Sequence, residues 1–334
     1  MITYKSNSKI IIFCPPRKVT GGPEALHQLS DRLYKIGVEN VFMHYIPKRK
    51  NAKAINYSVY KTKEINFVED HPDTILIIPE SMTFLIKKYP LSQKIIWWLS
   101  VDFYKILMDY RIRKQSFFTK LFYKQTDKEY HFEDLPNVFQ WAQSYRSGVY
   151  LKEHGISNHQ IDYVCDYINP SFTENKNVIK KDLNNKDVLY NPKKGKEEIS
   201  QLIKNSPELN WVPIQNMNAQ QIKDLMAKSL LYVDFGENPG RDKMLRESVS
   251  QNCCIISGKN GSSAYYEDLM IPDAYKFEFD KGKIPAIVSK IKEILENYSE
   301  HIPQFSIYKD VVLKEENVFE NKLKEIFRKD NYGK

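Results

Sequence analysis

Short apolar runs alternate along the chain with polar segments that have helical spacing. "KIIIFC", "VFMHYI", "TILIIPES" and "KIIWWLSVD" are each apolar and end in polar or turn residues. Such runs are typical of strands buried on both faces of a parallel sheet. Between the first two runs, "TGGPEALHQLSDRLYKIG" places Leu26, Leu29 and Leu33 on one helical face. The pattern predicts a strand-loop-helix unit with Pro23 at the first helical position and Gly37 at the helix end.

The same rhythm resumes after a polar stretch, "TENKNVIKKDLNNKD". The segments "DVLYNP", "LNWVPI", "LLYVDFG" and "CCIISG" are the predicted strands, and they alternate with helical segments, one of which starts at about Asp242. Regular strand-helix alternation favours a doubly wound α/β sheet. We therefore expect two Rossmann-like domains, at 1–168 and 187–305, joined by a linker at 169–186. A C-terminal helix at 306–334 is expected to pack back on the first domain.

Composition narrows the class of protein. The chain has 334 residues, of which 42% are hydrophobic and 28% charged, as in a soluble protein of two ordinary domains. Its formal charge of +8 suits phosphate-bearing ligands or an anionic membrane surface. Nucleic acid is not expected as a partner, because acidic and basic residues are interspersed and no nucleic-acid module is recognisable. Four cysteines without CxxC spacing, and a start without a signal-like run, predict a cytoplasmic protein.

The segment 105–131 mixes lysines and arginines with phenylalanines and leucines at helical spacing. A basic amphipathic helix of this kind can lie on an anionic bilayer, here the inner membrane face. The same aromatic stripe can instead pack into a core or line an acceptor groove. Both interpretations stay open.

Polar residues at the ends of the predicted strands are the candidates for chemistry, because ligands of open α/β sheets bind outside the carboxyl ends of the strands. In the first domain these are the turn at Gly21 and Gly22, followed by Glu24, and then Glu80 and Asp102. In the second domain they fall in three stretches: 191–194, 236–247 and 258–263.

The stretch "NPGRDKMLRE" combines features of an anion site. Gly240 permits close backbone approach, and the N–H groups at a helix start attract phosphate. Arg241 and Lys243 add positive charge, and the carboxylate of Glu247 suits the neighbouring hydroxyls of a ribose. A nucleotide diphosphate satisfies both demands. The alternative is a solvated helix face held by pairs of opposite charge at i,i+4 spacing.

Signals for other kinds of site are weak or absent. Lys193 and Lys194 precede Gly195 at a strand-to-helix turn, where a lysine can contact phosphate, although lysine-rich loops are common. GxxxxGK[ST] and GxGxxG are absent, which argues against kinases and dinucleotide-dependent dehydrogenases. DxD, HExxH and Cys/His clusters are absent as well, so neither a ligated metal nor a cofactor is expected.

These motifs, in this order, resemble the nucleotide-sugar glycosyltransferases with two facing Rossmann-like domains, the GT-B architecture. "TGGPEALHQLSDRLYKIG" is similar to the glycine-rich loop and first helix of that family, and "YVCDYINPSF" to the entry of its interdomain linker. "VLYNPKKGKEEISQLI" is similar to the start of the donor domain, and "MLRESVSQNCCIISGKNGSS" to the signature helix with the strand and glycine turn after it.

The resemblance implies roles for individual residues. It places Lys194 on a donor phosphate, Ile214 and Gln215 on the nucleobase through their backbone groups, and Glu247 on the ribose. The implied donor-binding residues are Gly21, Gly22, Lys193, Lys194, Ile214, Gln215, Gly240, Arg241, Lys243 and Glu247. The candidate catalytic carboxylates are Glu24, Glu80, Asp102 and Asp242.

The resemblance implies a metal-independent glycosyltransferase of bacterial surface-polysaccharide synthesis. Its substrate is a nucleotide-diphosphate sugar, and its acceptor is a glycan or a lipid-linked glycan. The chain departs from the retaining branch of the family, because Pro239 stands eight positions before Glu247, where that branch has a glutamate. Retention and inversion both stay open. The alternative function is a glycosyltransferase-like protein that binds without catalysis, or an assembly partner at the membrane.

Overall fold

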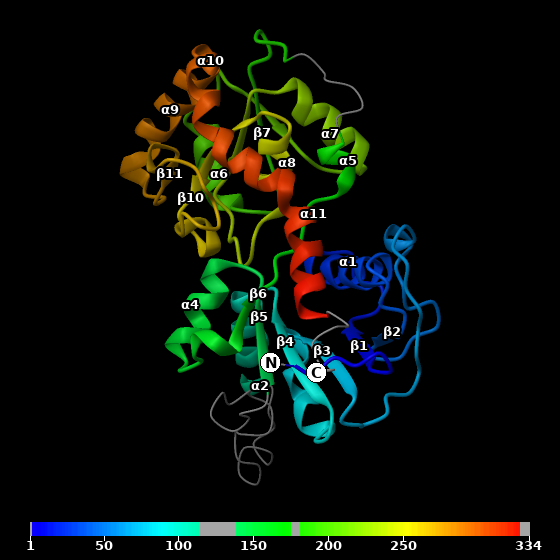
Figure 1. The fold of residues 1–334 in the computed structure, drawn as a ribbon. Coiled ribbons are helices and arrows are strands. Elements are labelled where there is room, and N and C mark those ends of the chain that lie inside the picture. The colour runs from blue at the N-terminus through cyan, green and yellow to red at the C-terminus, as the bar shows by residue number, and fades with distance from the viewer. Residues whose placement is uncertain (1, 114–137, 175–180, 328–334) are drawn as a thin grey trace. The chain divides into compact units, whose positions relative to one another are not determined.

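The computed structural model describes residues 2–113, 138–174 and 181–327. The chain divides into two compact units. The N-terminal unit comprises residues 1–166 together with 317–334, and the C-terminal unit comprises residues 167–316. Each unit is built around its own parallel sheet (Figure 1).

The sheet of the N-terminal unit has the order β2-β1-β3-β4-β5-β6, with every neighbouring pair parallel. Its strands are β1 (Lys9–Cys14), β2 (Val41–Tyr45), β3 (Thr74–Pro79), β4 (Gln93–Trp98), β5 (Val138–Ala142) and β6 (Ile161–Tyr163). β3 is buried at every position, as expected for a strand covered on both faces. β1, β3 and β4, which are adjacent in the sheet and buried at nearly every position, thus supply much of the core.

Helices of the N-terminal unit follow the strands. They are α1 (Gly21–Lys35), α2 (Val101–Arg113) and α4 (Tyr145–Glu153). Leu26, Leu29 and Leu33 of α1 are all buried, as the spacing predicts. The predicted helix start at Pro23 is wrong by two residues, because the carbonyl of Thr20 already accepts from the N–H of Glu24 and closes the first turn.

The sheet of the C-terminal unit has the order β11-β10-β9-β7-β8 and is also parallel. Its strands are β7 (Asp187–Tyr190), β8 (Asn210–Pro213), β9 (Leu231–Asp234), β10 (Cys254–Gly258) and β11 (Lys276–Phe277). Its helices are α5 (Pro170–Thr173), α6 (Lys196–Lys204), α7 (Ala219–Lys228), α8 (Lys243–Ser250), α9 (Ile284–Glu296) and α10 (Tyr298–His301). β9 and β10 are fully buried and form the centre of this core.

The last helix, α11 (Ser306–Ile326), contributes to both units. Tyr308 and Val312 belong to the core of the C-terminal unit. Further along, Phe319 stacks on Trp97 of β4 at a ring-centroid distance of 6.2 Å, and Arg32 of α1 pairs with Glu320 at 2.6 Å. The helix is therefore held by aromatic and charged contacts along its length.

Three predicted segments extend beyond the described residues. One is the C-terminal helix expected at 306–334, of which residues 328–334 lie outside the described part of the chain. Of the amphipathic segment 105–131, residues 105–113 lie in α2 and residues 114–131 lie outside the described part of the chain. The segment 169–186 contains α5, whose Phe172 packs into the core of the C-terminal unit, and its residues 175–180 are likewise not described.

Candidate functional site

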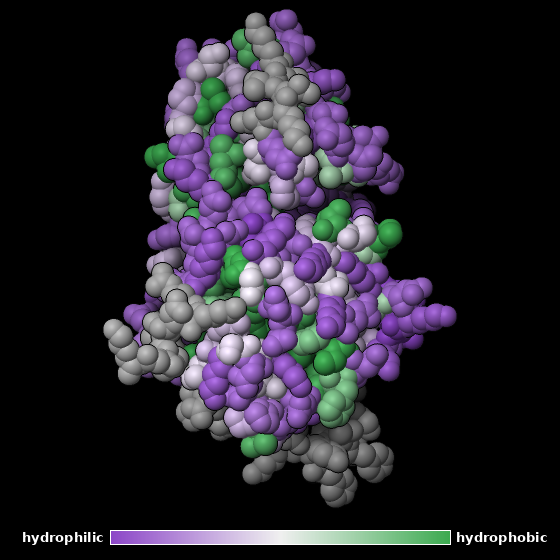
Figure 2. Space-filling view, turned by 45° about the vertical axis from the view of Figure 1, so that its right-hand side comes forward, coloured by the Kyte–Doolittle hydropathy of each residue, from purple (hydrophilic) through white to green (hydrophobic). Residues whose placement is uncertain are grey.

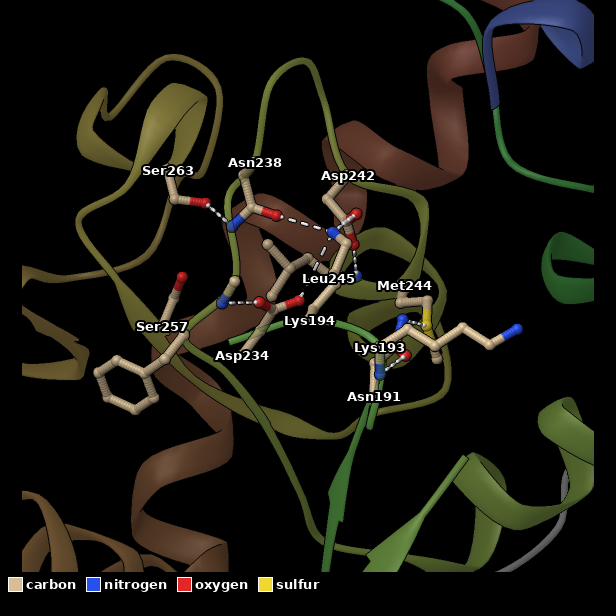
Figure 3. A network of polar contacts seen from close by, with 12 residues as sticks. Asn191, Lys193, Lys194, Asp234, Asn238, Asp242, Met244, Leu245, Ser257 and Ser263 are labelled. Atoms are coloured by element: carbon tan, nitrogen blue, oxygen red, sulfur yellow. Dashed lines mark hydrogen bonds and ion pairs between the residues drawn. The ribbon is translucent and has the colours of Figure 1, made fainter. Parts of the chain in front are cut away.

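A network of polar side chains lies at the carboxyl ends of β7 and β9 in the C-terminal unit (Figure 3). The ammonium group of Lys194 donates to Asn238 Oδ1 at 3.0 Å and forms an ion pair with Asp242. Asp234 Oδ2 lies 3.9 Å from the same nitrogen. Lys194, in the loop after β7, is thus surrounded by three oxygen-bearing side chains. Asp234 is the last residue of β9, and Asn238 and Asp242 belong to the loop that follows it.

Glycines bring the two loops together. Gly195, directly after Lys194, has a φ of +52°, and a Cβ there would lie 2.6 Å from the carbonyl carbon of Phe235 and 2.8 Å from the nitrogen of Gly236. Only a residue without a side chain fits this left-handed conformation at that separation. The Lys-Gly pair of the sequence therefore fixes where the lysine meets the loop after β9.

The charges in this network stabilise one another. Burial alone would raise the pKa of Asp242, but the adjacent Lys194 outweighs it and holds that pKa below its ordinary value. Burial likewise opposes the charge on Lys194, and the attraction of Asp242 and Asp234 raises its pKa nonetheless. Burial raises the pKa of Asp234, against the pull of Lys194. Lys194 is thus a cation whose position is fixed by an anionic Asp242.

Asn238 ties the loop after β9 to the loop after β10. Its side chain is fully buried and donates to Ser263 Oγ at 2.8 Å. The backbone carbonyl of Asn238 accepts from the N–H of Ser262 at 2.7 Å, and the hydroxyl of Ser262 donates to the backbone carbonyl of Gly240 at 2.6 Å. The predicted stretches 191–194, 236–247 and 258–263 therefore meet at one place.

The sequence predicts a helix start where Arg241 adds positive charge to an anion site. In the structure, the start of α8 is capped by a carboxylate, and Arg241 is paired. Asp242 is the N-cap, and its Oδ1 accepts from the N–H of Leu245 at 3.2 Å. Arg241 pairs with Glu315 of α11 at 2.6 Å, and its side chain is only 8% exposed. The fully buried Arg246 pairs with the other oxygen of Glu315 at 2.8 Å. Buried guanidinium groups need such a partner, since an unpaired buried charge is costly.

The remaining donor-site candidates fall into two groups. Lys243 and Glu247 are half-buried, at the first and fifth positions of α8. Lys193 is exposed and extends away from the network, while its N–H donates to Asn191 Oδ1 at 3.0 Å (Figure 3).

The predicted base-contacting pair follows β8. Ile214 is buried, and its N–H donates to the carbonyl of Tyr190 at 2.8 Å, which extends the pairing of β8 with β7. Gln215 is exposed, and Asn216 after it has a positive φ of 55°. The chain therefore turns sharply at the position that the resemblance assigns to the nucleobase.

The candidates of the N-terminal unit lie along one edge of its sheet. Gly21 and Gly22 form the first turn of α1, after β1, and Glu24 in the same turn accepts from the hydroxyl of Tyr60 at 2.9 Å. Glu80 directly follows β3, and Asp102, near the start of α2 after β4, pairs with Arg146. β1, β3 and β4 are adjacent and parallel, so these residues share the carboxyl edge of the sheet.

Glu80 is set apart from the other two carboxylates by its burial. Its side chain accepts from the N–H of Leu99 at 3.1 Å, which joins the ends of β3 and β4. Burial raises its pKa to about 8, against the opposing effect of that hydrogen bond. A group with this pKa is mostly protonated near neutral pH. Glu80 therefore holds two strand ends together and is poorly suited to accept a proton.

Sequence reasoning did not single out Asp234, Asn238, Arg246 or Glu315. Asp234 carried a usable signal, since it is a polar residue at the end of the buried run "LLYVD". Asn238 fell inside the stretch 236–247 but could not be distinguished there. Glu315 carried no local signal, because its partners Arg241 and Arg246 precede it by about seventy positions.

Among the described residues, no three side chains of His, Cys, Asp or Glu are grouped so as to hold a metal ion. Within the same residues, no helix combines the length and apolar character needed to cross a membrane.

Comparison with solved structures reveals the architecture. A glycosyltransferase from Rickettsia africae aligns with 96% of this chain and 98% of its own, at a TM-score of 0.58 and 14% identity. Anabaena Alr3699/HepE in complex with UDP aligns with 95% of this chain and 99% of its own, at a TM-score of 0.63 and 10% identity. The lipopolysaccharide outer core galactosyltransferase WaaB aligns with 95% of this chain and 99% of its own, at a TM-score of 0.59 and 13% identity.

The chain has the GT-B fold. The fold class expected from the sequence, two doubly wound parallel-sheet domains of GT-B type, is therefore confirmed. No family model matches the sequence, and no curated protein matches it either.

Proposed function

We propose that this chain transfers a sugar from a nucleotide-diphosphate sugar to a glycan or lipid-linked glycan acceptor in surface-polysaccharide synthesis. The observation that carries the proposal is the placement of Lys194 at the carboxyl ends of β7 and β9, within a GT-B fold. Ligands of open α/β sheets bind at that edge. HepE was solved in complex with UDP, which makes UDP the first nucleotide to test.

Lys194 is the proposed contact to the donor diphosphate. An ammonium group has three N–H donors, of which two serve Asn238 and Asp242. Asp234 Oδ2, at 3.9 Å, is beyond hydrogen-bond distance. The third N–H is therefore the one proposed for a phosphate oxygen, and Asp242 acts as the group that orients the ammonium.

The charge that stabilises the departing diphosphate comes mainly from Lys194, with Lys243 as the second cation. Arg241 has a supporting role in this proposal, since its guanidinium pairs with Glu315 and shapes the loop before α8. Glu247 is the proposed ribose ligand, and Gln215 and the carbonyl of Ile214 are the proposed base contacts. Catalysis is then electrostatic and needs no metal, although phage T4 BGT was solved with UDP and Mn²⁺.

If the reaction inverts configuration, Glu24 is the proposed group that deprotonates the acceptor. Glu80 is buried with a pKa of about 8, and Asp102 is paired with Arg146. Glu24 is half-buried in the first turn of α1, beside Gly21 and Gly22. A general base must be able to accept a proton, which the burial of Glu80 and the ion pair of Asp102 oppose, so Glu24 is the candidate that we propose.

The test is an assay of nucleoside diphosphate release from a panel of nucleotide sugars, with and without a chelator. Release that persists with the chelator and requires Lys194 supports the proposal. Tight nucleotide-sugar binding without release or transfer, across donors and glycan acceptors, would instead support the non-catalytic alternative that Pro239 suggests. The accompanying expectations, a cytoplasmic location and membrane contact through 105–131, are tested separately by fractionation.

A further inference from the structure

Two loops of the N-terminal unit carry an uncompensated positive charge. Residues 15–20 follow β1 and residues 46–63 follow β2, and together they hold eight basic residues and no acidic one. The rest of the chain is balanced, with 42 basic and 42 acidic residues. The eight basic residues of these two loops thus account for the whole formal charge of +8.

The two loops lie side by side and are fastened to each other. The guanidinium of Arg17 donates to the carbonyl of Lys50 at 2.6 Å and to that of Asn51 at 3.2 Å, while its backbone N–H donates to Ala52. Nearer to α1, the N–H of Thr20 donates to the hydroxyl of Tyr57 at 3.0 Å. The charges are therefore held on one face by a set of hydrogen bonds.

Seven of the eight cations are exposed. Lys61 and Lys63 lie over the rings of Tyr34 and Phe42. The other five have no ion-pair partner among the described residues: Arg17, Lys18, Lys48, Arg49 and Lys50. Neighbouring carboxylates are engaged elsewhere. Glu24 accepts from Tyr60, and Asp31 pairs with Lys35 and accepts from the N–H of Lys61.

Exposed apolar side chains accompany these cations on the same two loops. Val19 is 53% exposed, and Ile55 and Val59, in and after the short helix η1 (Ile55–Tyr57), are 83% and 76% exposed. Tyr57 and Tyr60, between and beside them, point inward and are buried. Figure 2, which turns this side of the N-terminal unit forward, shows apolar residues standing among hydrophilic ones.

We propose that this surface, residues 15–20 with 46–59, docks on a phospholipid bilayer with anionic headgroups. Each lysine or arginine near such a surface contributes attraction, and apolar side chains that enter the headgroup region add to it. The combination of unpaired cations with exposed valine and isoleucine fits this partner better than a soluble anion, which gives the apolar side chains nothing to contact. The proposal concerns residues different from 105–131 and does not depend on transferase activity.

The test is co-sedimentation of the full chain with vesicles. One set is phosphatidylcholine alone, and the other is two parts phosphatidylcholine to one part phosphatidylglycerol. We expect binding to the second set that weakens as salt is raised. The variant K48Q/R49Q/K50Q is expected to lower the partition coefficient roughly 10- to 100-fold, since each cation contributes several-fold. The variant I55S/V59S is expected to lower it as well, with the salt dependence kept.

The matched control is K204Q/K228Q/K281Q, which removes the same charge from exposed lysines of the C-terminal unit. It is expected to bind as the unchanged chain does. Equal losses in both triple variants, or equal binding to the two vesicle sets, would overturn the proposal. So would binding to soluble heparin without binding to anionic vesicles. Thermal unfolding of each variant confirms that it is folded.

Discussion

Glu315 of α11 lies 2.6 Å from Arg241 and 2.8 Å from Arg246, so one buried carboxylate holds both arginines at the start of α8. All three side chains are less than one tenth exposed. Arg246 also donates to the carbonyl of Arg241 at 3.0 Å. The conformation of the loop that brings Asn238 and Asp242 to Lys194 thus depends on a residue near the end of the chain.

Replacement of Glu315 by Gln is expected to destabilise the protein by about 3–5 kcal/mol, because it removes the charge of a buried carboxylate that pairs with two buried guanidinium groups. Denaturant unfolding measures this loss. Asp310→Asn is the matched control, since it removes one negative charge from an exposed position of the same helix. Similar unfolding midpoints for the two variants would contradict the role given to Glu315.

Gly195→Ala is expected to weaken nucleotide binding as well as stability. Its added Cβ would lie 2.6 Å from the carbonyl carbon of Phe235, so the loops that carry Lys194 and Asn238 must separate. Gly37→Ala is the control, because Gly37 also has a positive φ but no atom lies within 4 Å of its added Cβ. Backbone strain of about 1–2 kcal/mol is expected in both variants. Calorimetric titration with UDP is expected to show weaker binding for Gly195→Ala alone, and equal affinities would count against the close packing of the loops.

Glu80→Gln is expected to change how stability depends on pH. In the folded protein the pKa of Glu80 is about 8, above the ordinary value of 4.5. Between these two values the unfolded chain releases a proton that the folded chain retains, so Glu80 lowers the stability progressively as the pH rises. The variant lacks this loss, and its stability relative to the unchanged protein should increase by up to about 1.4 kcal/mol per pH unit across that window.

Urea unfolding at pH 5, 6, 7 and 8 measures this effect. Glu208→Gln is the control, because a hydrogen bond from Lys292 lowers the pKa of Glu208 from its ordinary value of 4.5, and the group therefore titrates below the window. Its stability difference from the unchanged protein should stay constant over that pH range. A constant difference for Glu80→Gln as well would show that its carboxyl is not protonated in the folded state.

Glu24→Gln is expected to lower kcat by about 100-fold or more while leaving the Kd for the nucleotide unchanged, if Glu24 deprotonates the acceptor. Steady-state transfer assays and nucleotide titrations measure the two quantities. Tyr60→Phe removes only the hydroxyl that donates to Glu24 and should have a smaller effect. Full activity of Glu24→Gln, together with loss of activity in Asp102→Asn, would move the role to Asp102.

The sequence was sufficient for the fold because the buried strands are short apolar runs at regular spacing. β3 and β9 are recognisable from their letters alone, and so is the turn at Lys194 and Gly195. The electrostatics of the site were not predictable in the same way. Arg241 was expected to add charge to an anion site, and only the position of Glu315, far along the chain, reveals that its charge is already paired.

The predicted helix start at Pro23 shows a second limit. Proline is favoured in the first turn of a helix, but the rule does not say at which residue the turn begins. In the structure the hydroxyl of Tyr57, from another loop, accepts from the N–H of Thr20 and accompanies a start at Gly21. The residue before the helix is thus held by a contact with a distant part of the chain, which a rule based on local sequence does not include.

The central claim, that Lys194 binds the diphosphate of a nucleotide donor, is tested most directly by calorimetric titration of UDP into Lys194→Met and Lys193→Met. The two variants lose the same charge at adjacent positions, but only Lys194 belongs to the network with Asn238 and Asp242. The account predicts that Lys194→Met weakens binding by about tenfold or more, while Lys193→Met binds as the unchanged protein does. Equal affinities in the two variants would contradict it.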